Sequence, residues 1–144
     1  MWSMLRQVHR SDDDLIDFLA RLGHDVEGAL RARHALLSEL IAARRDPATA
    51  LDRCGLASRR CVRAFDQALT HLNQMRVPAQ ASECAFELRE WLDAHLAACD
   101  HLSRAALARD KLDLERAIQY LVGGAQSAHR FNDARERLLR RLAS

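Results

Sequence analysis

The sequence predicts an all-α protein, and three observations support this prediction. Twenty-five of the 144 residues are alanine, while β-branched residues are few. Alanine has the highest intrinsic helix propensity, so propensity summed over long windows favours helix. Apolar residues recur with the alternating spacing of three and four that marks one face of a helix. Only five glycines and two prolines interrupt the chain.

Composition indicates one globular domain with few charge-driven partners. Apolar residues make up 49% of the chain and charged residues 29%, which is the balance of a folded protein. The formal net charge is +2, so nothing in the charge balance points to nucleic acid. The N-terminal sequence lacks the apolar run of a signal peptide, and no stretch of about 18 apolar residues could span a bilayer. We therefore expect a cytoplasmic protein without a membrane segment.

The first helix is expected to begin at Ser11. This serine and the aspartates at 12–14 combine a side-chain cap with acidic charge in the first turn. Residues 1–10 are then a short helical arm against the bundle of residues 11–144. A break near Gly23 is an alternative to one continuous helix. The apolar stripe contains Leu15, Leu19, Leu22, Val26, Ala29, Leu36 and Leu40, widened by Leu30, Leu37 and Ile41.

Three further helices follow from proline and aspartate signals. Asp46 and Pro47 predict a cap and a helix that starts at 47, and Val77–Pro78 ends this helix. The third helix is expected over 79–109, and the fourth starts after a cap at Asp110. The second stripe comprises Leu51, Cys54, Ser58, Cys61, Phe65, Ala68, Leu72 and Met75. The third comprises Ala85, Leu88, Leu92, His95, Cys99, Leu102 and Ala106.

Four helices of about 30 residues with short connections have one economical arrangement. Neighbours in the chain run antiparallel, and all four apolar stripes face inward. The predicted fold is therefore an antiparallel up-down-up-down four-helix bundle with a short N-terminal helical arm.

The segment HLAACDH places His95 and Cys99 four positions apart, which stacks them on one helical face. In the predicted bundle, a layer at similar height contains His34, Cys54, Cys61, His95 and Cys99. Imidazole and thiolate bind zinc and softer metals, so a metal- or ligand-binding bundle is one alternative. The cysteines lack CxxC spacing, however, and unligated cysteine is among the most buried residue types. We expect these residues to pack in the core, with no cofactor.

Sequence signatures of catalysis are absent from the chain. It contains no Glu-x-x-His pair, no C-x-x-C-H segment, no G-x-S-x-G elbow and no phosphate-binding loop. We therefore expect no enzymatic activity. Gly123 and Gly124 lie in the middle of a predicted helix, where they favour close approach of a facing residue such as Trp91 or Phe65. The alternative is a small ligand pocket at the same glycines.

The segment GLASRRCVRAF, residues 55–65, resembles the turn and recognition helix of a helix-turn-helix DNA-binding motif. In that reading Arg59, Arg60 and Arg63 would face the groove of DNA. The apolar stripe passes through Gly55 without a change of register, whereas a turn would interrupt it. We therefore expect one continuous helix with solvated arginines, and DNA binding is a second alternative.

The expected function is protein–protein contact, as in an adaptor, a small chaperone or a regulatory subunit that self-associates. The arm carries Trp2, Leu5 and Val8, which are costly to expose unless they dock on the bundle or on another protein. These three residues are the candidate partner-binding residues, and the partner is another protein or a second copy.

Overall fold

The computed structural model describes residues 2–46, 48–109 and 111–144, and within them there are four α-helices and no strand. The helices are α1 (Trp2–Arg45), α2 (Ala50–Gln74), α3 (Ser82–Ala108) and α4 (Lys111–Ala143), with a 3-10 turn, η1 (Ala79–Ala81), before α3. The description leaves out the side chains of Trp2, Leu5, Val8, His9 and Lys111. The predicted all-α fold is confirmed.

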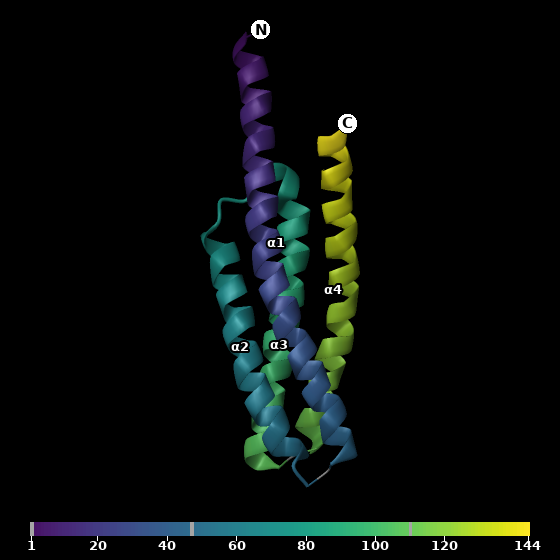
Figure 1. Cartoon of the computed structure of the whole chain (residues 1–144). Helices are drawn as coiled ribbons and strands as arrows, with labels where there is room; N and C mark the ends of the chain where they lie inside the picture. Colours follow the sequence, from purple (N-terminus) through teal and green to yellow (C-terminus); the bar gives the residue numbers. More distant parts are fainter. Residues whose placement is uncertain (1, 47, 110) are drawn as a thin grey trace.

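The four helices run alternately down and up, as predicted (Figure 1). Close backbone packing joins α1 to α2, α2 to α3 and α3 to α4, whereas α1 and α4 approach each other at few points. Each helix therefore packs mainly on its neighbours in the chain. In the part of the chain that is described, no helix has both the length and the apolar character needed to cross a membrane.

Helix α1 begins at Trp2, so the prediction of a helix start at Ser11 is wrong. Ser11 lies inside the helix, and its Oγ accepts a hydrogen bond from Gln80 Nε2 at 2.8 Å instead of capping a helix end. The helix also continues through Gly23, so the alternative of a break there is not seen. The first turns of α1 extend beyond the ends of the other helices in Figure 1. We call residues 2–10 the N-terminal overhang.

Small residues bring α2 and α3 together. A Cβ added at Gly55 would lie 2.9 Å from the Cβ of Ala106, so the two backbones meet closely there. One turn further along α2, Ser58 Oγ donates a hydrogen bond to the Gly55 carbonyl at 2.9 Å and lies 3.0 Å from Ser103 Oγ. Ser58 and Ala106 belong to the predicted apolar stripes, and Gly55 and Ser103 are next to stripe residues in the sequence.

The helix ends agree with the predicted signals to within a few residues. α2 starts at Ala50 rather than 47 and ends at Gln74, where Met75 turns to an extended conformation ahead of Val77–Pro78. Residues 79–81, predicted as the start of the third helix, form η1 instead. α3 ends at Ala108, and Arg109, which follows it, has the left-handed backbone angles φ 53° and ψ 42°. The proposed helix start at Pro47 and cap at Asp110 lie outside the described residues.

Candidate functional site

His95 lies at the centre of the bundle with its side chain fully enclosed. Its Nδ1 lies 2.8 Å from the carbonyl oxygen of Trp91, one turn earlier in α3, and its Nε2 lies 3.0 Å from Arg33 Nε of α1. Arginine nitrogens only donate, so Nε2 must be the acceptor and Nδ1 must carry the proton. The geometry therefore assigns a neutral imidazole with both nitrogens occupied.

All four helices contribute to the surroundings of this ring. Phe65 of α2 stacks on it, with centroids 4.6 Å apart and planes at 12°, and the Trp91 ring lies 4.5 Å away. On the α4 side, a Cβ added at Gly124 would lie 3.4 Å from Ala94 Cβ and 3.5 Å from His95 Cε1. The close approach predicted for Gly124 is present, but Ala94 and His95 face it rather than Trp91 or Phe65.

The electrostatics of the site keep His95 uncharged near neutral pH. Burial lowers the pKa of His95 to about 4, and the charge of Arg33 acts in the same direction. The hydrogen bond to the Trp91 carbonyl opposes both effects without cancelling them. A neutral ring whose nitrogens both have partners is poorly suited to proton transfer or to metal binding.

The four cysteines are buried free thiols. Cys61 and Cys99 are hydrogen-bonded to each other across the α2–α3 interface, and this bond together with burial raises the pKa of Cys61. Burial also raises the pKa of Cys84 to about 11, and burial together with Glu39 raises the pKa of Cys54. The same Cys61–Cys99 bond lowers the pKa of Cys99, which is fully buried. Because the thiolate is the reactive and metal-binding form, Cys54, Cys61 and Cys84 act as small core side chains at neutral pH.

The predicted histidine and cysteine layer is only partly brought together. Cys54, Cys61, His95 and Cys99 are all buried, in agreement with the expectation of core packing. His34 is exposed on α1. Among the described residues, no group of three or more His, Cys, Asp or Glu side chains is arranged to hold a metal ion.

The resemblance to a helix-turn-helix motif rests on a turn at Gly55, and the structure has none there. α2 is a single helix through Gly55 to Gln74, as the unbroken apolar stripe predicted. Arg59, Arg60 and Arg63 are exposed on this helix.

The N-terminal overhang is the other candidate region. The partner-binding prediction falls on Trp2, Leu5 and Val8, whose backbone belongs to α1 but whose side chains lie outside the described residues. The described side chain of Met4 is 72% exposed. Met4 precedes Leu22 by five helical turns, so both point from the same face of α1. Leu22 is buried in the core, whereas Met4 extends past it.

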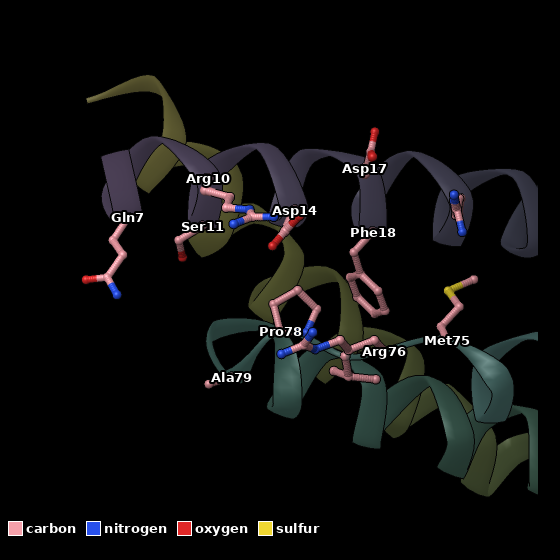
Figure 2. Close-up of a pocket in the computed structure, with 12 residues that line it drawn as sticks. Gln7, Arg10, Ser11, Asp14, Asp17, Phe18, Met75, Arg76, Pro78 and Ala79 are labelled. Carbon is pink, nitrogen blue, oxygen red and sulfur yellow. The ribbon is translucent and has the colours of Figure 1, made fainter. Parts of the chain in front are cut away.

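A groove of about 500 Å³ lies at the root of the overhang, between α1 and the connection from α2 to η1. Figure 2 shows Phe18 of α1 pointing toward this connection, where Met75, Arg76 and Pro78 lie. Charged residues line the groove along α1, namely Arg10, Asp14, Asp17 and Arg21. The groove thus combines apolar side chains with charged ones at its edge.

Sequence reasoning missed this groove and also missed Arg33 as the partner of His95. The aspartates at 12–14 were interpreted only as a helix start. One sequence signal could have identified the groove face, because Gln7, Arg10, Asp14, Asp17 and Arg21 recur at helical spacing. No protein-family model, curated protein or solved structure matches this chain.

Proposed function

We propose that this protein acts by protein–protein contact, without catalysis, and that it self-associates through the N-terminal overhang. The carrying observation is that α1 continues beyond the bundle with Met4 exposed in line with the buried core residue Leu22. When the apolar face of a helix continues past the core on which it packs, the exposed part favours an interface with another molecule.

The energetics of the N-terminal overhang also support the proposal. The overhang spans about 13 Å at about 1.5 Å per residue. The overhang is continuous with the rest of α1, so it needs no separate helix nucleus. Most helical stability in proteins comes from packing of an apolar face, so a partner that packs on the overhang would stabilise it. The apolar residue types at Trp2, Leu5 and Val8 make packing against a partner favourable.

The interior supports a role without catalysis. The pKa values of Cys54, Cys61 and Cys84 are raised, so these thiols are poor nucleophiles at neutral pH. The pKa of Cys99 is lowered by its bond with Cys61, but its side chain is fully buried and out of reach of a substrate. His95 has no free nitrogen with which to act as a general base.

Sedimentation equilibrium of the full chain tests this proposal. We expect reversible self-association in the wild type and a dissociation constant raised at least about tenfold in the Trp2→Ala/Leu5→Ala double variant, which loses apolar area at the interface. The matched control is Leu30→Ala/Ile41→Ala, on the same helix, where both side chains are about half exposed.

Two results would overturn the proposal. One is a wild type that stays monomeric over the whole concentration range. The other is an equal loss of association in the Leu30→Ala/Ile41→Ala control, which would move the interface from the overhang to the exposed apolar side of α1.

A further inference from the structure

The groove at the base of the overhang lies where α1 continues past the end of α2, its antiparallel neighbour. Toward this end of the bundle, α1 and α2 are still joined by Asp25 and His71, whose Oδ1 and Nδ1 atoms are 3.0 Å apart. α2 ends three residues after His71, at Gln74, while α1 continues in the same direction to Trp2. The lining of the groove on α1 extends from Gln7 to Arg21, which is about 20 Å of helix.

Among the described residues, several charged side chains along this part of α1 form no ion pair. Arg10, Asp14 and Asp17 are all exposed, and among the described residues no ion pair involves any of them. Arg10 and Asp14 are one helical turn apart, as are Glu27 and Arg31, which do form an ion pair on the same helix. From Arg10 to Asp17 the groove therefore presents a basic group followed by two acidic groups, with Arg21 one turn further along α1.

We infer that the groove holds the N-terminal overhang of a second copy, which runs antiparallel to α1 and takes the place of the missing turns of α2. This inference rests on the proposed self-association and names its geometry. In an antiparallel pair of identical helices, residues whose numbers have a constant sum face each other. A twofold axis near residue 12 places Arg10 opposite the partner's Asp14, and Asp14 opposite the partner's Arg10.

Charge order favours a second copy over an unrelated helix as the occupant. Twofold pairing uses the same surface on both partners, so it requires a surface that is complementary to itself. The order of basic then acidic residues from Arg10 to Asp17 satisfies this requirement in the antiparallel direction only. A parallel pair would place Arg10 against Arg10 and Asp14 against Asp14, and like charges in an interface are unfavourable.

The floor of the groove supplies the apolar part of the contact. Phe18 points from α1 toward Pro78 and Met75 (Figure 2). Met75, Val77 and Pro78 are each partly exposed there. A helix laid along the groove would cover these side chains, so burial of apolar area adds to the paired charges.

Charge exchange in the full chain tests this geometry by sedimentation velocity. Arg10→Asp alone places two aspartates opposite each other at both ends of the pair, and Asp14→Arg alone places two arginines there. We expect each single variant to raise the dissociation constant at least about tenfold. An equimolar mixture of the two variants restores both opposite-charge contacts, so we expect it to associate as tightly as the wild type.

The matched control uses Glu27→Arg and Arg31→Asp, which alter an exposed pair of the same spacing on the same helix. These variants, alone or mixed, should leave association unchanged. A wild type that dimerises but ignores Arg10→Asp and Asp14→Arg overturns this geometry and leaves the proposed function standing. Single variants that dissociate without recovery on mixing also overturn it, and a monomeric wild type overturns both.

Discussion

Polar side chains at the centre of the bundle and at its N-terminal end differ in burial and in hydrogen bonding. At the centre, His95 has partners for both nitrogens, and the buried carboxylate of Glu87 accepts a hydrogen bond from Arg130 Nε at 3.0 Å. At the N-terminal end, Arg10 and Asp14 are exposed without ion pairs among the described residues. Both regions belong to helices with one buried and one exposed face. The difference arises because α1 has 44 residues and its neighbour α2 has 25.

The length of the neighbouring helix, more than the local sequence, determines here whether polar side chains on a helix are enclosed or exposed. Where four helices overlap, polar groups are satisfied inside and the interior is fixed. Where only α1 continues, Met4, Arg10 and Asp14 are exposed, and we propose that this surface binds another molecule. Changes at the centre should therefore alter folding stability, and changes at the end should alter association.

The largest expected effect is at the centre, in Phe65→Ala. Phe65 is fully buried and contacts both the His95 and Trp91 rings. Removing it leaves a cavity, and we expect a loss of about 3–5 kcal/mol in the free energy of unfolding. Urea denaturation measures this change. The control is Phe86→Ala, because Phe86 is 56% exposed, and its loss should be small. Equal losses in the two variants would contradict the packing described for the centre.

The next effect is a dependence of stability on pH that originates at His95. In the unfolded chain the histidine pKa is about 6.5, whereas burial lowers the pKa of His95 to about 4 in the folded state. Between these values the unfolded state takes up a proton that the folded state excludes. Stability should therefore fall by about 3 kcal/mol as the pH drops from 6.5 to 4.

The His95→Gln variant isolates this contribution, because glutamine has polar atoms but does not titrate. We expect the difference in unfolding free energy between wild type and variant to shrink as the pH falls through this window. A constant difference would show that His95 has an ordinary pKa in the folded protein.

Two glycine substitutions give smaller effects of opposite sign. An added Cβ at Gly55 would lie 2.9 Å from Ala106 Cβ, so Gly55→Ala should cost about 1–3 kcal/mol through overpacking. An added Cβ at Gly123 meets nothing within 4 Å, so Gly123→Ala should stabilise the protein by up to about 1 kcal/mol through helix propensity. Thermal melts of the two variants provide the comparison. Stabilisation by Gly55→Ala would contradict the close approach of α2 and α3.

The helices and their buried faces were predictable from the sequence wherever apolar residues recur regularly at helical spacing. Every member of the third stripe from Ala85 to Leu102 is buried, including His95 and Cys99. The first stripe was less accurate. Phe18 is buried, although the predicted stripe does not include it. Leu30 and Ile41 were expected to widen the stripe, but both are about half exposed. α1 packs on α2 far more closely than on α4, so the side of the helix that carries Leu30 and Ile41 stays open.

The candidate site was harder to predict because it depends on where neighbouring helices end. A serine followed by three aspartates fits a capping pattern, but the same residues can also stand inside a helix, as they do in α1. The hydroxyl of Ser11 bonds to Gln80, a residue 69 positions away, which no local pattern indicates. The groove likewise forms because α2 ends at Gln74 and the connection through Pro78 lines the space beside α1. Arg33 reaches His95 across 62 positions of sequence, a pairing that no local pattern encodes.

The most direct test of the division between centre and end is the unfolding midpoint measured over about a hundredfold range of protein concentration. Self-association stabilises the folded state by mass action, so the midpoint of the wild type should rise with concentration. In Trp2→Ala/Leu5→Ala, which associates more weakly, the midpoint should rise less over the same range. In Phe65→Ala it should be lower but should rise as in the wild type. A wild-type midpoint that does not change with concentration would contradict the account.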